Sequence, residues 1–279
     1  MESNFFTPGE VVENNLKAQV TKANLPLGKM ILLGIMAGAF IALGGATSNV
    51  AVHNIANVGI ARTLAGAIFP VGLMLVILVG GELFTGNCLM LMACKDKRIR
   101  ISQMLRNLIV VYLTNLVGAV IIDILIFYSG QLDYTNGALG AYTIKVAIAK
   151  ANIAPGTAIA SGILCNILVC LAILMAGAAK DVAGKIWAIF FPIWAFVIGG
   201  FEHCVANMFY IPMGMLAATN NNYVEKAEEL YGITSSQCAD LLSIQSTSSF
   251  IYVTIGNILG GMIFVGLTCY IVHNKKWKS

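Results

Sequence analysis

The sequence is short of charged residues. Lys and Arg number 17 and Asp and Glu number 13 among 279 residues, so charged residues make up 11% of the chain. A soluble domain carries about 25%. Hydrophobic residues make up 58%, and the mean hydropathy is +0.82. This balance excludes an ordinary soluble domain and predicts a protein whose solvent is lipid. The net charge of +4 is too small to indicate a nucleic-acid partner.

Residues that bind metals are few and scattered. The chain has three histidines and seven cysteines, and no two cysteines form a Cys-x-x-Cys pair. Zinc and iron–sulfur sites need several such ligands at close spacing. A membrane redox enzyme with haem would need convergent ligands at membrane depth, and one deep histidine is too few. We therefore expect no metal, no cofactor and no enzymatic activity.

The N-terminal segment 1–26 lacks the features of a removable signal peptide. It is polar and mixed in charge, without a short apolar core followed by a small-residue cleavage site. Residues 8–24 instead predict an amphipathic helix at the membrane surface.

Six apolar stretches are long enough to cross a bilayer, which takes about 20 residues. They predict a six-span domain over 27–272, followed by a tail at 273–279, with approximate spans at 27–52, 62–93, 104–130, 156–178, 185–216 and 246–272. The second and fifth stretches are too long for simple spans. Each is interrupted by polar, glycine-rich sequence, at 80–87 and at 199–207.

The distribution of Lys and Arg predicts the orientation. If both termini are cytoplasmic, the inner side holds thirteen cations: Lys17, Lys22, Lys29, Lys95, Lys97, Arg98, Arg100, Arg106, Lys180, Lys185, Lys275, Lys276 and Lys278. The outer side then holds four: Arg62, Lys145, Lys150 and Lys226. This asymmetry predicts that both termini are cytoplasmic. The long outer connection at 217–245 is predicted to fold over the outer face.

The two halves of the chain, 27–130 and 156–272, share a pattern. Both middle spans are interrupted by a Gly pair, a glutamate and a closing asparagine, and the third and sixth spans share an Asn-x-x-Gly element at 115–118 and 257–260. Three spans per half require the halves to be inverted relative to each other. The predicted fold class is an all-α membrane protein with six transmembrane helices in an inverted repeat, whose second and fifth helices are broken. Such breaks place a permeation site near the midplane of the membrane.

Two polar residues in the interruptions are candidates for that site. His203 is the one histidine at mid-span depth, where an imidazole can hold an anion or pass it a proton. Thr85, in the other interruption, offers a hydroxyl that can bind His203 or a ligand. The alternatives are a structural histidine bonded to a carbonyl and a threonine that satisfies a freed helix carbonyl.

Other polar residues at depth suggest supporting roles. Glu82 and Glu202 would repel an anion directly, so we interpret them as struts that accept hydrogen bonds from exposed backbone amides, with Asn87 and Asn207 bracing the same breaks. Asn166 is either an anion donor or an interhelix contact. Lys150 stands before the fourth span, where it either attracts anions to a pore mouth or extends to water as an ordinary interfacial lysine. The sequence offers no explanation for Asp123.

With these residues assembled, the sequence resembles the formate/nitrite transporter family. The resemblance covers about residues 5–272, and its most specific parts are Glu82-Leu83-Phe84-Thr85 and Gly200-Phe201-Glu202-His203-Cys204-Val205-Ala206-Asn207-Met208, with further matches at 165–172 and 253–257. It implies an aquaporin-like fold in a homopentamer of the bacterial-type inner membrane, with one pore per protomer and formate, nitrite or hydrosulfide as the transported anion.

The resemblance also implies roles for individual residues. Thr85 and His203 would form the central polar pair, and Lys150 and Asn166 would assist anion attraction. Apolar constrictions would flank them, formed by Phe69, Leu73, Leu83, Phe84, Val169 and Phe196. A greasy constriction strips water from an anion, and protonation at the histidine is the less costly route for a weak acid.

The choice among substrates rests on weaker signals. Residues 209–214 lean toward formate-type members. Cys204 departs from the serine common in formate channels, and Gly86-Asn87-Cys88 departs from their small-residue sequence. Nitrite and hydrosulfide therefore stay open. A neutral-solute pore of the water or glycerol type is a further alternative, although neither half contains Asn-Pro-Ala.

Overall fold

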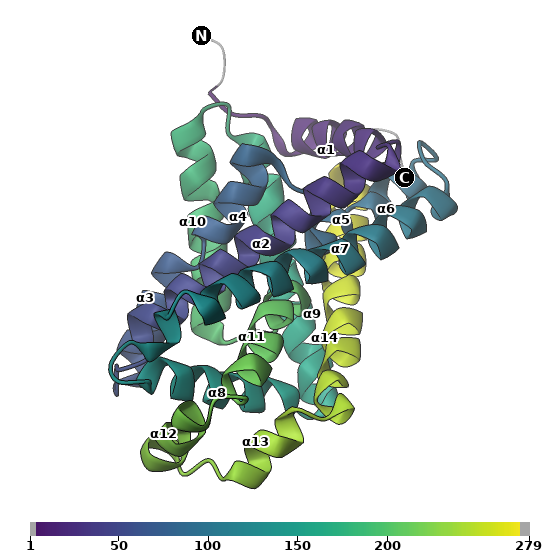
Figure 1. Ribbon diagram of the computed structural model, residues 1–279. Helices are drawn as coiled ribbons and strands as arrows, with labels where there is room; N and C mark the ends of the chain where they lie inside the picture. The colour runs from purple at the N-terminus through teal and green to yellow at the C-terminus, as the bar shows by residue number, and fades with distance from the viewer. Residues whose placement is uncertain (1–3, 274–279) are drawn as a thin grey trace.

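The computed structural model describes residues 4–273 and is all-helical apart from connections and one isolated β-bridge (Figure 1). Six helical stretches are long and apolar enough to span a membrane, as the sequence predicts: Leu27–Val52, Val58–Gly80, Ile101–Tyr128, Pro155–Ala178, Val182–Gly199 and Ser249–His273. Helices α2, α7, α9 and α10 form the first, third, fourth and fifth of these stretches. The second comprises α3 (Val58–Ile68), α4 (Val71–Leu75) and η1 (Val76–Gly80), and the sixth comprises α14 (Ser249–Ile258), η4 (Leu259–Leu267) and α15 (Thr268–His273).

The second and fifth stretches are broken where the sequence predicts. The chain leaves η1 at Gly80 (φ 108°) and leaves α10 at Gly200 (φ 67°), a left-handed conformation that glycine adopts at no steric cost. Residues 81–83 and 201–203 have no helical structure. The chain then forms α5 (Phe84–Asn87) and α6 (Met90–Lys95) after the first break, and α11 (Cys204–Ala217) after the second.

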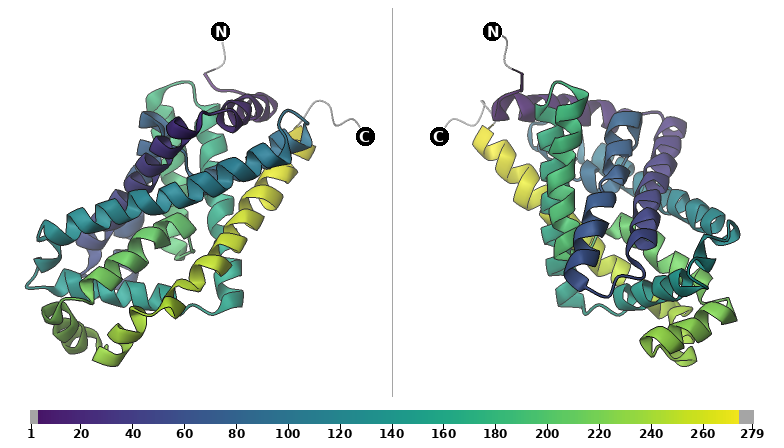
Figure 2. Two further views of the ribbon diagram at one scale, coloured as in Figure 1. Left: turned by 45° about the vertical axis from the view of Figure 1, so that its right-hand side comes forward. Right: turned by 90° about the vertical axis from the view of Figure 1, so that its left-hand side faces the viewer.

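The two halves run in opposite directions (Figures 1 and 2). Helices α2 and α7 begin at the face that carries α1 (Pro8–Ala23), whereas α9 and α14 begin at the face that carries α8 (Ala138–Ala151), α12 (Asn221–Tyr231) and α13 (Ser235–Leu241). We call these the terminal face and the cap face. Each half has the same close helix crossing, because a Cβ on Gly118 would overlap the carbonyl of Ile35 and a Cβ on Gly260 would overlap that of Ile163.

The cap face contains helices that the sequence patterns did not predict individually. The connection at 217–245 does cover this face, and it does so as α12 and α13. Helix α8 was missed, because its 14 residues are too few for a span and Lys145 and Lys150 interrupt its apolar run.

Helix α1 matches the amphipathic helix expected at 8–24, but its apolar side is covered by the protein. Pro8 stands in the first turn, and Thr7 and Glu10 form a capping box. Val11, Val12 and Leu16 are buried against the rest of the protein, so these side chains do not face lipid as those of a surface helix would. The predicted tail at 273–279, with Lys275, Lys276 and Lys278, lies outside the described residues except for His273.

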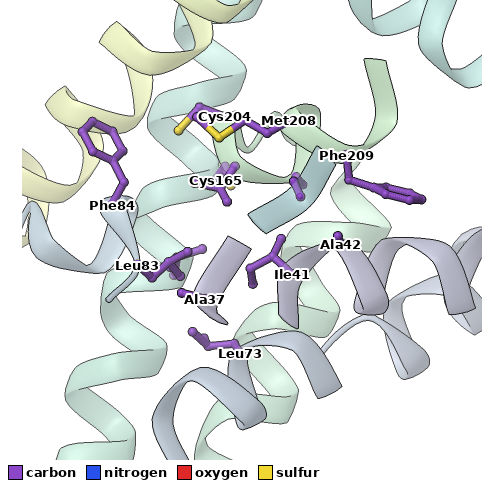
Figure 3. Packing of buried hydrophobic residues seen from close by; sticks show 14 of the residues in the cluster. Ala37, Ile41, Ala42, Leu73, Leu83, Phe84, Cys165, Cys204, Met208 and Phe209 are labelled. Atoms are coloured by element: carbon purple, nitrogen blue, oxygen red, sulfur yellow. The ribbon is translucent and has the colours of Figure 1, made fainter. Parts of the chain in front are cut away.

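The core lies where the breaks meet α2 and α11 (Figure 3). Ile41 from α2, Leu73 from α4, Leu83 from the first break and Met208 from α11 belong to one buried cluster, with Phe84 of α5 at its side. All five side chains are at most 4% exposed. Lipid-facing helices therefore enclose a dry centre into which both breaks project.

Candidate functional site

The two breaks meet at Thr85 and His203. Thr85 lies in α5 and His203 is the N-cap of α11, and Oγ1 of Thr85 lies 2.9 Å from Nε2 of His203. The other ring nitrogen, Nδ1, accepts the backbone N–H of Ala206 at 3.0 Å. The neutral ring therefore carries its hydrogen on Nε2 and donates it to Thr85. The hydroxyl hydrogen of Thr85 is then free for a ligand.

Two asparagines from α7 and α14 hold the freed backbone of the breaks. Asn115 Nδ2 donates to the carbonyls of Gly34 (2.8 Å) and Glu82 (2.9 Å), and its Oδ1 accepts the N–H of Phe84 (3.0 Å). Asn257 makes the same three bonds, to the carbonyls of Gly162 (2.8 Å) and Glu202 (2.9 Å) and from the N–H of Cys204 (2.8 Å). The repeated Asn-x-x-Gly element was the sequence signal for these residues, although it did not identify them as part of the site.

A lysine, a glutamate and an asparagine form a buried cluster on the terminal side of the centre. Lys22 Nζ lies 3.1 Å from Glu82 Oε1 and donates to Asn87 Oδ1 at 2.8 Å. Asn87 Nδ2 in turn donates to Glu82 Oε2 at 2.7 Å and to Asn107 Oδ1 at 2.7 Å. Sequence reasoning treated Lys22 only as a topology charge and did not single out Asn107.

A matching cluster lies on the cap side. Lys150 Nζ binds both carboxylate oxygens of Glu202 at 3.0 and 3.1 Å and lies 5.0 Å from the ring centroid of Tyr210, while Asn207 Nδ2 donates to Glu202 Oε2 at 2.8 Å. The side chain of Lys150 is 18% exposed, so it is paired within the protein. The expectation that Glu202 binds exposed backbone amides was wrong, and the same holds for Glu82. The carboxylates of Glu82 and Glu202 are hydrogen-bonded by side chains, whereas the backbone of the breaks is bound by the two asparagines of α7 and α14.

Asn166 lies beside the central pair, but its side-chain amide donates its hydrogen bonds to backbone carbonyls. Its Nδ2 donates to the carbonyls of Thr85 (3.2 Å) and Asn257 (2.6 Å). Both amide hydrogens are therefore used, which favours the interhelix contact over an anion donor.

Apolar side chains surround the central pair. Phe69 and Phe196 meet edge to face with ring centroids 5.5 Å apart, and the Phe196 ring lies 6.1 Å from the imidazole of His203. All of the side chains expected in constrictions are buried, with exposures of 1–4%: Phe69, Leu73, Leu83, Phe84, Val169 and Phe196. A ligand that reached Thr85 and His203 would leave water behind.

A cavity of about 640 Å³ leads from the cap face to this centre. Its lining includes Phe69, Phe196 and His203, so it reaches the central histidine. Three cations line it, Arg62, Lys145 and Lys150, whereas Glu202 is the one carboxylate in the lining. The net positive charge of a cleft with low-dielectric walls raises the local concentration of anions.

Two further observations concern buried acidic groups and metal ligands outside the central pair. Asp123 in α7 is fully buried, and neither carboxylate oxygen has a hydrogen-bond partner within residues 4–273; nothing in the structure explains it. Among residues 4–273, no three His, Cys, Asp or Glu side chains are grouped so as to bind a metal ion.

The comparisons with known proteins agree on one family. The family model described as "Formate/nitrite transporter" matches residues 9–271. The chain is 38% identical to a "Probable formate transporter" of Methanothermobacter thermautotrophicus over 99% of this chain and 100% of that protein, and 38% identical to "Formate channel FocA" of Haemophilus influenzae over 94% and 93%. A solved "Pentameric formate channel with formate bound" superposes with a TM-score of 0.78 at 32% identity, covering 88% of this chain and 97% of that one.

Proposed function

The chain belongs to the formate/nitrite transporter family, whose members are multi-pass membrane channels and transporters rather than enzymes, and we propose that this member conducts formate. The observation that carries the proposal is the Thr85–His203 pair, held at the inner end of a cation-lined cavity and surrounded by apolar side chains. Relatives named as formate channels or transporters support the choice of anion.

The proposed path begins at the cavity on the cap face. Its excess of cations draws in anions, and Lys150 lines the same cavity as His203. Phe69 and Phe196 then remove water from the anion. At the centre, the hydroxyl of Thr85 donates to a formate oxygen, while Nε2–H of His203 keeps Thr85 oriented.

Proton transfer at Nε2 makes the passage less costly for a weak acid. A charged ring would turn an Nδ1–H toward the N–H of Ala206, and the capping bond would be lost. The ring is therefore neutral between transport events. When a proton from the aqueous cavity binds Nδ1, the imidazolium passes its Nε2 proton through the hydroxyl of Thr85 to formate, which forms formic acid and leaves a neutral ring with its hydrogen on Nδ1. Return of the hydrogen to Nε2 restores the bond from Ala206. Neutral formic acid loses far less solvation than formate in an apolar constriction.

The proposed setting is a bacterial-type inner membrane with the terminal face in the cytoplasm, because that orientation leaves most Lys and Arg inside. We also propose a homopentamer with one pore per protomer. One relative is a pentameric formate channel, and apolar side chains such as Trp187 and Phe191 of α10 are more than half exposed on the single chain.

Flux measurements in one proteoliposome preparation test the substrate. Formate, nitrite, hydrosulfide and lactate are compared at equal gradients, with empty liposomes and a glycerol swelling assay as controls. We expect formate to pass fastest and glycerol entry to match that of empty liposomes. If nitrite or hydrosulfide passed faster than formate, that anion and not formate would be the preferred substrate. Rapid glycerol entry would refute the proposal of an anion channel.

A further inference from the structure

The terminal and cap clusters are built alike, but one member differs. A shift of 120 residues relates Glu82 to Glu202 and Asn87 to Asn207, and a shift of 142 relates Asn115 to Asn257. These related residues make corresponding hydrogen bonds. The shift of 142 residues that relates α7 to α14 also relates Asn107 to Ser249. A long amide in the terminal half thus corresponds to a short hydroxyl in the cap half.

Asn107 ties the terminal cluster together. It is fully buried, and its Oδ1 accepts from Asn87 Nδ2 at 2.7 Å. Its own Nδ2 lies 3.4 Å from both the carbonyl of Lys22 and Glu82 Oε2. One side chain therefore connects the lysine backbone, the glutamate and the bracing asparagine.

The cap half leaves the corresponding groups without such a connection. Ser249 is 1% exposed, and its Oγ has no hydrogen-bond partner in the part of the chain that the structure describes. Asn207 is fully buried, its Oδ1 has no partner, and its Nδ2 donates only to Glu202 among the described residues. Leaving such groups unbonded destabilises the folded protein, and buried polar groups of this kind are ordinarily satisfied by protein or by ordered water.

We propose that a water molecule binds in the cap half between Ser249, Asn207 and the backbone carbonyl of Lys150. Asn207 is the counterpart of Asn87, and Lys150 is the counterpart of Lys22 because each lysine pairs with the corresponding glutamate. Ser249 takes the place of Asn107, and a serine side chain is shorter than asparagine by about the size of one water. The site would offer one hydroxyl, one amide hydrogen and one carbonyl, which meets the two to four polar partners that a buried water requires. The water completes the Lys150–Glu202–Asn207 cluster, as Asn107 completes its counterpart.

The proposed water distinguishes the two faces of the protein. Nζ of Lys22 bonds Asn87 as well as Glu82. Among the described residues, Nζ of Lys150 bonds the carboxylate of Glu202 and no side-chain amide, and Lys150 lines the cavity. The cap-side ammonium group therefore has fewer fixed partners and more freedom to follow an entering anion.

A structure of the intact protein at about 2 Å resolution is the direct test, since ordered waters are visible there. We expect a water within hydrogen-bond distance of Ser249 Oγ and Asn207. In the variant Ser249→Asn the amide should take its place, and in Asn107→Ser a new water should appear in the terminal half. A wild-type map at this resolution without the water would overturn the proposal.

Thermal unfolding provides a second test. Ser249→Ala removes the hydroxyl without adding atoms and should lower the melting temperature by about 2–4 °C, whereas Ser249→Asn should melt at or above the wild-type temperature. Ser248→Asn, at an exposed neighbouring position, is the matched control. If Ser249→Ala melts with the wild type, the site is dry and the proposal is wrong. Neither the map nor the melting temperature depends on which anion is transported, so the proposed water can fail while the proposed function holds, and the reverse.

Discussion

At the scale of single residues, the site depends on side chains that satisfy backbone rather than touch substrate. A helix break in a membrane exposes N–H and C=O groups that lipid cannot bind. Asn115 and Asn257 each bind three such groups. This leaves Thr85 and His203 free to face each other across the centre.

Asn257→Ala should destabilise the protein without changing its substrate preference. The change removes three interhelical bonds, worth together about 2 kcal/mol at roughly 0.6 each in a membrane protein, and it leaves backbone groups unbonded. Thermal unfolding in detergent measures the loss, and Asn222→Ala, at an exposed position on α12, is the control. Equal melting of the two variants would show that the break is held by other groups.

His203 allows the two roles of an imidazole to be separated. Asparagine can still cap α11, because it is a good N-cap residue, but it carries no proton. We expect His203→Asn to assemble normally and to weaken the increase of formate flux as the pH falls, because asparagine cannot pass a proton to formate. His203→Phe should lose the cap as well and lower both stability and flux. A wild-type pH profile in His203→Asn would remove the ring from the mechanism.

At the scale of helices, the sequence predicted best those features that depend on a single property of the chain, such as the length of an apolar stretch or the presence of glycine. Apolar length identified all six spans, and the glycine-rich interruptions identified both breaks because Gly80 and Gly200 take positive φ. Helix α8 was missed because nothing in a 14-residue apolar helix distinguishes a span end from a connection. Lys22 was missed for a different reason: its contact with Glu82 joins positions 60 residues apart and depends on the docking of α1.

The crossing of α9 and η4 should tolerate no side chain at Gly260. A methyl group there overlaps the carbonyl of Ile163, and overpacking of this kind costs about 1–3 kcal/mol. Gly260→Ala is therefore expected to melt below the wild type. Gly28→Ala is the matched control, since a Cβ at Gly28 has no atom within 4 Å. A Gly260→Ala variant as stable as Gly28→Ala would show that the helices can separate freely.

An ion pair links α1 to the connection between α6 and α7, and it makes their association pH-dependent. Arg98 donates to both carboxylate oxygens of Glu13 at 2.9 and 2.7 Å. These bonds hold the pKa of Glu13 below its ordinary value of 4.5. The stabilisation is therefore present at neutral pH and is lost as pH falls through the lowered pKa.

Glu13→Gln should loosen α1 only where Glu13 is charged. Hydrogen exchange of the α1 amides at pH 7 should be faster in the variant than in the wild type, and the difference should vanish well below pH 4.5, where both side chains are neutral. Lys17→Gln is the control, because Lys17 lies 3.9 Å from the same carboxylate and is 67% exposed. A difference that persists in acid would assign the effect to packing rather than charge.

At the scale of the whole molecule, sequence reasoning gave the fold class and the central pair but not the shape of the entrance. The cavity is lined by residues from α2, α3, α8, α10, α11 and α12. A local sequence pattern cannot predict which residues of such distant helices will line a common cavity. Arg62 and Lys145 entered the sequence argument only as outer charges. The structure places both in the cavity wall, where Arg62 donates to the carbonyl of Ile198 and Lys145 lies over the ring of Tyr231.

The charge of this entrance should control capture of anions from the cap face. With Arg62 and Lys145 both replaced by Gln, formate entry from that side should fall several-fold at about 0.01 M salt, where fields extend about 30 Å, and much less at 0.15 M, where they extend about 8 Å. Lys226→Gln is the matched control, because Lys226 pairs with Glu229 on α12 and does not line the cavity. Lys150 is left intact in the double variant, so the central path is unchanged and flux at saturating formate should be retained. An equal loss at both salt concentrations would mean that the two side chains shape the entrance sterically, because a steric obstruction, unlike a field, is not screened by ions.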